Sequence, residues 1–174
     1  MTESVMRFCM IDRIAEVRPG IRLTAIKTLS AEEEYLKDHF PRFPVMPGVL
    51  MLEAMFQASM WLVRKSEDFA HSIVLLQEAR NVKFADFVEP SEVLTVRAEV
   101  VRQDDRTTLL KAHASVEESL AASGRLVLER FNLADRYPQY GAMDGYIRRA
   151  MRCQFARLCG NGALVETAGQ GHIQ

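Results

Sequence analysis

The sequence has few cysteines and no excess of charge of either sign. Cys9, Cys153 and Cys159 are odd in number, and they fit neither a disulfide framework nor a four-ligand metal site. We therefore expect a reducing cytoplasm as the location and no bound metal. Lysine and arginine total 22 against 23 acidic residues, a net charge of −1 in 174 residues. This balance gives no electrostatic reason to expect a nucleic acid or an anionic membrane as partner.

A signal peptide and a membrane span are both disfavoured. The amino terminus lacks a basic segment followed by an apolar run. Residues 43–63 approach the length of a membrane span, with Glu53 as their only formally charged residue. Pro44 and Pro47 shorten any continuous helix there, and Glu53 and Gln57 would cost several kcal/mol near the bilayer centre. We predict instead a helix buried in the centre of a domain.

β-rich segments on both sides of this helix predict an antiparallel sheet. The first pair, residues 5–17 and 21–29, flanks the turn-forming Pro19-Gly20. Later β-rich segments lie at 72–76, 82–87, 93–102, 107–116 and 125–133. No alternation of strand and helix follows. The pattern predicts an α+β domain over residues 1–135, in which an antiparallel sheet wraps one long central helix.

Two shorter helices are also predicted. Ser30 and Glu33 match a capping box and predict a helix through about Lys37. Residues 136–174 are predicted to form an extension with an amphipathic helix over about 143–159. Its apolar residues recur at helical spacing at Ile147, Met151, Phe155 and Leu158. This helix is expected to end near Gly160 and to be followed by a frayed tail from Thr167.

The segment before the central helix has a distinctive proline pattern. Pro41, Pro44 and Pro47 hold the chain extended, and Pro47 is predicted as the first helical residue. Met46 has no side-chain oxygen, so the first free amides, those of Gly48 and Val49, have no obvious internal partner. They could hold an oxygen on which negative charge develops. Water or a neighbouring carbonyl could equally take them.

Three polar side chains in this region are candidates for chemistry. Burial favours the neutral form of a carboxyl group, which is the form that a general acid needs, so Glu53 is one candidate. A buried ion pair is the structural alternative. Gln57, four residues on, could fix the Glu53 side chain by a hydrogen bond or could simply be a satisfied core group. A histidine side chain can accept a proton near neutral pH, so His39 could act as a base, or it could be a packed ring beside Phe40.

These residues form a long motif: His39-Phe-Pro, then Pro44-x-x-Pro-Gly-Val-Leu, then Glu53-Ala-Met-x-Gln57. It resembles the signature of the β-hydroxyacyl-acyl-carrier-protein dehydratases, and the resemblance covers about residues 10–132. With glutamate at position 53, the motif resembles the non-isomerising branch of that family. The resemblance implies a hotdog fold and a lyase of fatty acid or related acyl-chain biosynthesis.

The same resemblance implies the site and its partners. His39 of one chain would remove a proton from carbon 2 of a 3-hydroxyacyl thioester, and Glu53 of a second chain would protonate the departing hydroxyl. The Gly48 amide would polarise the thioester carbonyl. The implied assembly is a homodimer with shared active sites, alone or as a trimer of dimers. The substrate would be linked to acyl carrier protein or to CoA, with no cofactor. The substrate-binding residues would be Gly48, Val49, Gln57, Phe43, Met46 and Phe84.

Some features depart from the family pattern. Asp38 and Ser91 stand where the family usually has glycine, and aspartate is among the few side chains that tolerate left-handed backbone angles. The extension carries Arg148, Arg149, Arg152 and Arg157. These arginines either form a solvated face or meet the acidic surface of an acyl carrier protein.

Two other functions remain open from the sequence. A hotdog acyl-thioesterase would use a carboxylate to direct water, and release of free thiol from acyl-CoA would identify it. A non-catalytic acyl-binding subunit would bind ligand tightly without turnover.

Overall fold

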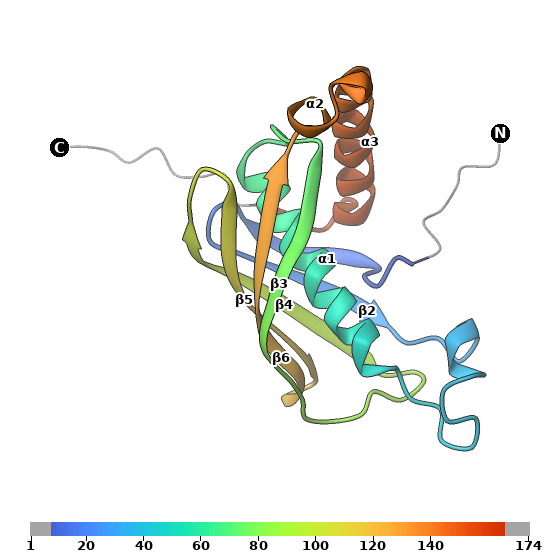
Figure 1. Cartoon of the computed structure of the whole chain (residues 1–174). Helices are drawn as coiled ribbons and strands as arrows, with labels where there is room; N and C mark the ends of the chain where they lie inside the picture. The colour runs from blue at the N-terminus through green and yellow to red at the C-terminus, as the bar shows by residue number, and fades with distance from the viewer. Residues whose placement is uncertain (1–7, 166–174) are drawn as a thin grey trace.

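The computed structural model describes residues 8–165, which form one antiparallel sheet curved around a long helix (Figure 1). The helix, α1, spans Gly48–Ser66. The strands are β1 (Arg13–Arg18), β2 (Arg22–Thr28), β3 (Ile73–Phe84), β4 (Val93–Gln103), β5 (Thr107–Val116), β6 (Ser119–Phe131) and β7 (Leu164–Val165). Their order across the sheet is β3-β6-β5-β4-β2-β1-β7, and only β1 and β7 pair in parallel. This is the α+β architecture that the sequence predicts.

The first hairpin turns at Pro19-Gly20, as predicted. Gly20 has a φ of 75°, a left-handed conformation that glycine adopts without steric cost. β1 begins at Arg13, later than the predicted start at residue 5, and residues 1–7 lie outside the described chain. The Met10 amide donates to the side-chain oxygen of Gln57 (2.9 Å), so it is not available for sheet pairing.

The predicted short helix after Ser30 is wrong in its start and in its type. The structure has a single 3-10 turn there, η1 (Glu34–Leu36), without a side-chain cap. The Ser30 hydroxyl accepts from the Glu32 amide (3.2 Å), only two residues along the chain. Such a local turn competes with helix capping, so the helical turn begins only later.

Helix α1 is buried on most sides and begins one residue later than predicted. Pro47 is its cap residue, because the φ of −56° suits a helix but the ψ of 135° is extended. The buried residues of the helix are Met51, Ala54, Met55, Gln57, Ala58, Ser59, Met60, Trp61, Leu62, Val63 and Arg64. Each large apolar side chain buried there stabilises the fold by roughly 1.5–3 kcal/mol. Within residues 8–165, no helix is long and apolar enough to cross a membrane.

Strand β3 is one long strand where the sequence predicts two, at 72–76 and 82–87. Its register against β6 shifts twice, and the second shift lies between Arg80 and Lys83. Asn81, inside that shift, has a φ of 52°. Bulges of this kind interrupt the alternation of side chains, which explains the broken sequence pattern. β3 pairs with β6 alone and forms one edge of the sheet.

The meander of β4, β5 and β6 follows. β4 and β5 coincide closely with the predicted segments, whereas β6 begins at Ser119, before the predicted start at residue 125. The loop before β4 turns at Pro90-Ser91. Ser91 has a φ of 77°, and its amide donates to the Leu29 carbonyl (2.8 Å). Serine thus adopts the left-handed conformation that favours glycine.

After β6 the chain forms α2 (Leu133–Arg136), the 3-10 turn η2 (Pro138–Tyr140) and α3 (Ala142–Cys159), followed by β7 (Figure 1). α3 lies where the sequence predicts a helix over 143–159, and Gly160, with a φ of 52°, caps it. The Phe155 ring packs edge-on against Phe69 (5.6 Å between centroids) and tilted against Trp61 (6.0 Å). The predicted tail from Thr167 lies outside the described residues.

Candidate active site

The segment between η1 and α1 folds back on itself before the helix begins. The His39 amide donates to the Tyr35 carbonyl (3.1 Å), and the Phe43 amide donates to the Phe40 carbonyl (2.8 Å). The left-handed residue of this turn is Phe40, with a φ of 48°, and not Asp38. The His39 ring lies against the Phe40 ring, with 4.6 Å between centroids. These contacts fix the position of the imidazole.

A pocket of about 290 Å³ opens between this segment, the start of α1 and the loop after β3. It is lined by His39, Val45, Met46, Gly48, Met51, Phe84, Ala85, Asp86 and Phe87. Four of the predicted site residues are among them: His39, Met46, Gly48 and Phe84. The candidate base and the beginning of the central helix therefore share one cavity.

The first amides of α1 have no acceptor within their own helix. Pro47 provides no side-chain cap. The Leu50 and Met51 amides donate to the Pro47 carbonyl (2.9 and 3.3 Å). The amides of Gly48 and Val49 therefore remain without an acceptor in the helix. A helix N-terminus carries roughly half a positive charge and stabilises an oxygen that becomes negative. Gly48 lines the pocket, whereas the Val49 side chain is 67% exposed.

Glu53 does not line this pocket. It lies five residues beyond Gly48, about 7.5 Å along the helix and well round its circumference. Its carboxylate accepts a hydrogen bond from the Gln57 amide (2.8 Å), as the spacing of four residues predicts. The same Gln57 amide donates to the Phe8 carbonyl (2.7 Å). Because the Gln57 oxygen accepts from Met10, this buried side chain holds both Glu53 and the amino-terminal segment in place.

Asp86 places a different carboxylate in the pocket. Its two oxygens accept hydrogen bonds from the Phe87 amide (2.8 Å) and from the Ser119 hydroxyl (3.1 Å). These bonds stabilise the loop after β3. Phe43, at the rim, is 46% exposed and packs edge-on against Phe87, with 5.4 Å between centroids. In the part of the chain that the structure describes, no three His, Cys, Asp or Glu side chains are grouped to hold a metal ion.

A larger depression of about 680 Å³ has an acidic lining. It is formed by Phe8, Met10, Ser30, Glu32, Glu33, Glu34, Tyr35 and Asp38. Burial, and then the charge of Glu33, raise the pKa of Tyr35 to about 12, so its hydroxyl stays protonated. None of the predicted site residues lines it. We therefore assign the candidate active site to the smaller pocket.

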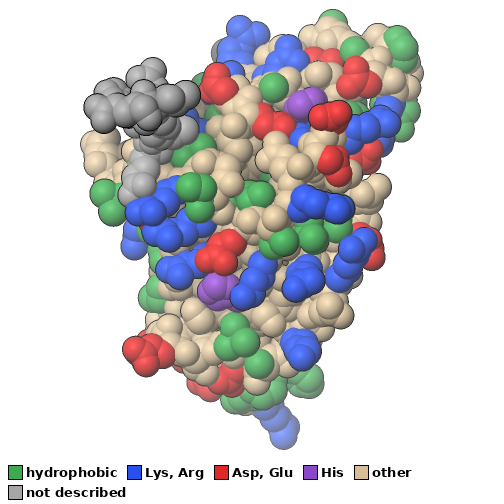
Figure 2. Space-filling model, turned by 90° about the vertical axis from the view of Figure 1, so that its left-hand side faces the viewer, with side chains coloured by type: hydrophobic (Ala, Val, Ile, Leu, Met, Phe, Trp, Pro, Cys, Tyr) green, Lys and Arg blue, Asp and Glu red, His purple; other side chains and the backbone are tan. Residues whose placement is uncertain are grey.

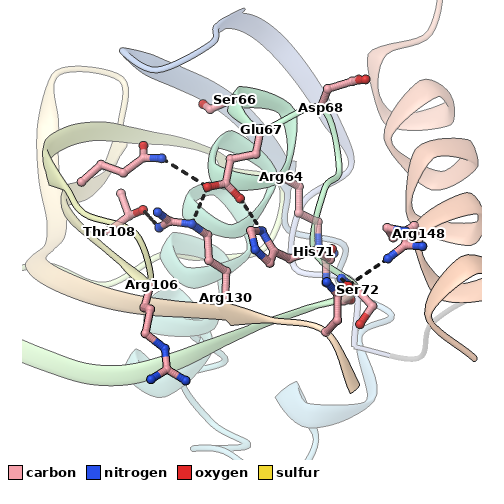
Figure 3. Close-up of polar contacts among 12 residues, drawn as sticks. Arg64, Ser66, Glu67, Asp68, His71, Ser72, Arg106, Thr108, Arg130 and Arg148 are labelled. Carbon is pink, nitrogen blue, oxygen red and sulfur yellow. Dashed lines mark hydrogen bonds and ion pairs between the residues drawn. The ribbon is translucent and has the colours of Figure 1, made fainter. Parts of the chain in front are cut away.

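An ionic network lies at the other end of α1 (Figure 3). Glu67 forms an ion pair with Arg130, whose side chain is 2% exposed, and contacts His71 Nδ1 (2.9 Å). Arg64 donates to the carbonyls of His71 and Ser72, at 3.1 Å each. Burial lowers the pKa of Arg64 to about 10. The network ties the end of α1 to β6 and to the start of β3.

Asp144, in the first turn of α3, is a residue that sequence reasoning missed. Its carboxylate accepts from the Ser72 hydroxyl and from the amides of Leu133 (2.7 Å) and Ala134 (3.1 Å). Burial opposes its ionisation, but these three donors and Arg148 outweigh burial and lower the pKa of Asp144. The sequence feature that could have identified it is a single carboxylate at the start of an arginine-rich helix. Asp144 anchors α2 and α3 to the sheet.

Two arginines of α3 face the rest of the protein. Arg148 donates to the Asn132 side chain (2.9 Å), and Arg152 donates to the Asp68 carboxylate (2.8 Å). Arg149 is exposed. The hypothesis that these arginines together meet an acidic partner is therefore not favoured for Arg148 and Arg152.

The antiparallel sheet around one long helix, with a pocket at the amino end of that helix, defines an α+β protein of the hotdog class. Residues 4–125 match the FabA-like domain family, and the chain belongs to that family.

Sequence relatives and a solved structure agree with this assignment. The chain is 39% identical over 116 residues to a 3-hydroxyacyl-[acyl-carrier-protein] dehydratase FabZ of Levilactobacillus brevis, covering 67% of this chain and 78% of the relative. It is 36% identical over 119 residues to the FabZ of Ruminiclostridium cellulolyticum, covering 68% and 84%. The dehydratase heterocomplex ApeI:P of Xenorhabdus doucetiae shares the fold, with a TM-score of 0.61 at 20% identity, covering 74% of this chain and 86% of that one.

Proposed function

We propose that this protein is a lyase that dehydrates a 3-hydroxyacyl thioester to the trans-2-enoyl thioester. The thioester is carried by acyl carrier protein or CoA, and the reaction belongs to cytoplasmic fatty acid or related acyl-chain biosynthesis. One observation carries the proposal: His39 and the unbonded Gly48 amide line the same pocket. The relatives named as 3-hydroxyacyl-[acyl-carrier-protein] dehydratases support the same reaction.

In the proposed mechanism, His39 removes a proton from carbon 2 while negative charge develops on the thioester oxygen. The Gly48 amide donates a hydrogen bond to that oxygen, and the helix N-terminus adds its partial positive charge. Glu53 gives a proton to the 3-hydroxyl group, the bond from carbon 3 to oxygen breaks, and water leaves as the double bond forms. Each proton transfer contributes about 10²–10⁴-fold to the rate. The removal of water involves proton transfers and cleavage of one carbon-oxygen bond with no net oxidation or reduction, so the proposed reaction requires no redox cofactor.

Glu53 reaches the pocket from a second copy of the chain in this proposal. Its own chain holds it outside the pocket lining, next to Gln57. The long edge strand β3 is available for pairing with another β3, and Leu75 on it is 48% exposed. The active assembly is therefore a homodimer with two shared sites, alone or as a trimer of dimers.

The acyl chain is proposed to lie against the apolar part of the lining. Met46 is buried, and Phe84 closes the pocket from the sheet side. Phe43 and Val49 are exposed in the single chain, and we place both at the entrance, where substrate or the second subunit covers them. Gln57 acts by holding Glu53 and does not itself touch the substrate.

Residues 136–174 are proposed to be an extension separate from the catalytic domain of residues 1–135. The Asp144 hydrogen bonds and the Phe155 ring contacts attach it to that domain. Its attachment lies near the carboxyl-terminal end of α1 (Figure 1), whereas the pocket lies at the amino-terminal end, beside Gly48.

The test follows the absorbance of the conjugated enoyl thioester with the purified protein and with single-residue variants. We expect His39→Ala and Glu53→Gln each to lower turnover by about 10²–10⁴-fold. Asp86→Asn is the matched control, because it removes a pocket carboxylate that has a structural role. Release of free thiol without enoyl product would identify a thioesterase instead. A greater loss of turnover in Asp86→Asn than in Glu53→Gln would overturn the assignment of Glu53 as the general acid.

A further inference from the structure

The outer face of the sheet has a basic depression that the proposed reaction does not use. Its volume is about 260 Å³, and it is lined by Asn81, Lys83, Lys111, Ala112, Ser123, Gly124 and Arg125. Lysine and arginine side chains crowd the middle of the face seen in Figure 2. The lining has three cations and no carboxylate.

A bulge in β3 brings cations of two strands to the same face. Arg80 pairs with Arg125 and Lys83 pairs with Ser123, so three steps along β3 match two steps along β6. Since side chains alternate along a regular strand, two residues three apart would otherwise point to opposite faces. The extra residue, at the left-handed Asn81, places Lys83 on the same face as Arg125.

Cations also stand directly opposite one another across three strands. Lys111 of β5 pairs with Arg125 of β6, which in turn pairs with Arg80 of β3. Like charges placed directly opposite destabilise a sheet. Arg80 is neutralised by Glu78 (2.6 Å). Within residues 8–165 no ion pair involves Lys83, Lys111 or Arg125. Glu99 of β4 lies directly opposite Lys111, whereas Arg125 lies between two cations, Lys111 and Arg80, so the repulsion is only partly offset by the protein itself.

His113 lies near charged residues of this face of both signs. It lies opposite Arg97 of β4 and Ser123 of β6, two residues from Lys111 on its own strand. Burial, and then Arg97, lower the pKa of His113. Glu99 opposes the shift, and Lys111 adds a smaller lowering. An anion bound nearby would reverse the effect of the cations on this ring.

We propose that the depression binds a phosphate group, either as free inorganic phosphate or as the phosphomonoester of a small molecule. The ammonium groups of Lys83 and Lys111 and the Arg125 guanidinium would donate charge-assisted hydrogen bonds to its oxygens. The bound anion offsets the repulsion between the three cations. The site is separate from the candidate active site, because Lys83 faces outward while the next residue, Phe84, lines the inner pocket. The proposal therefore does not rest on the proposed reaction.

The full chain is titrated with inorganic phosphate at constant ionic strength and pH. A parallel titration with chloride is the control. The readouts are the His113 imidazole resonances and the melting temperature. We expect a saturable change in the resonances, an upward shift of the His113 pKa and a higher melting temperature. Lys111→Ala and Arg125→Ala should each weaken binding about tenfold or more. Arg149→Ala, which removes an exposed cation of α3, should bind phosphate as the parent does.

A second readout separates loss of the site from loss of the fold. Without phosphate, Arg125→Ala should melt at the same temperature as the parent or above it, because the substitution removes the like-charge pairs with Lys111 and Arg80. A linear, unsaturable response, or equal binding by the parent and Arg125→Ala, would overturn the proposal. Titrations with CoA and with CoA lacking its 3′-phosphate then identify the source. Tighter binding of intact CoA indicates the phosphomonoester, and equal weak binding of the two CoA forms indicates free phosphate.

Discussion

The Cβ atom that Gly48 lacks would lie 3.0 Å from Cδ1 of the Phe84 ring, closer than ordinary van der Waals contact. The last residue of β3 therefore packs directly on the first residue of α1. Glycine at this position allows the sheet edge to close over the helix N-terminus, and it keeps the Gly48 amide on the wall of the pocket.

Gly48→Ala should displace the Phe84 ring and lower turnover by about tenfold or more, because misplacement near reacting atoms is costly. The added methyl group meets three ring carbons within 3.2 Å. Steady-state kinetics with the enoyl thioester measures the effect. Gly145→Ala is the control, since a Cβ there meets nothing within 4 Å and alanine favours a helix. Equal kinetics for both variants would contradict the role of this contact.

Mixed oligomers test whether the active sites are shared. A dimer with His39→Ala in one chain and Glu53→Gln in the other retains one intact site if the residues act across the interface. Random reassembly of equal amounts should then restore about one quarter of the parent activity, since half of the dimers are mixed. Each variant alone is the control. A mixture no more active than the two variants alone would show that each site lies within one chain.

Gln57→Met should destabilise the fold and impair catalysis together. The substitution leaves the Met10 amide without its acceptor and Glu53 without its donor. We expect a loss of about 1–3 kcal/mol in the free energy of unfolding, measured in urea, and a lower kcat with little change in KM. Ser59→Ala is matched to it on the same helix. The Ser59 hydroxyl is buried without a hydrogen bond, so its removal should be neutral or stabilising.

Asp144→Asn should change the pH dependence of stability. The pKa of Asp144 is below its ordinary value of 3.8, so the carboxylate stabilises the fold above that value. This contribution is lost as the pH falls through the lowered pKa. The variant should be about 1–3 kcal/mol less stable at neutral pH and should lose less stability on acidification. Urea unfolding at several pH values measures this. Parallel profiles for parent and variant would contradict it.

Ser91→Gly should stabilise the protein. A serine with a φ of 77° is strained, whereas glycine adopts this conformation freely. The greater freedom of glycine in the unfolded chain reduces the gain, so we expect about 0.5–1 kcal/mol in thermal or urea unfolding. Ser115→Gly, within strand β5, should be destabilising instead, because Ser115 has no positive φ for glycine to relieve. A destabilising effect at both positions would show that the strain at Ser91 is negligible.

The features that the sequence predicts correctly depend on local spacing. The turn at Gly20 follows from its dipeptide, and the hydrogen bond from Gln57 to Glu53 follows from helical periodicity. The α+β architecture, a sheet wrapped around one helix, follows from one apolar helix among β-rich segments, and the family resemblance implies the hotdog fold. The grouping of His39 with Gly48 follows from the resemblance, since spacing alone did not relate them.

The features that sequence reasoning missed depend on distant partners. The bulge at Asn81 exists only in relation to β6, and no sequence pattern within β3 specifies that register. Asp144 acts through Ser72, which lies 72 residues away. The direction of Arg152 likewise depends on Asp68, 84 residues away. Such contacts can be assigned only when the chain is folded.

The short strand β7 has a consequence for assembly. Leu164 and Val165 pair with Glu16 and Val17 of β1, so part of the sheet edge opposite to β3 is already occupied. A sheet with two open edges can add subunits at both sides and grow into a fibre, whereas one with a single open edge joins one partner and stops. In the proposed dimer, which would form at β3, β7 therefore limits edge-to-edge growth at the opposite side of the sheet.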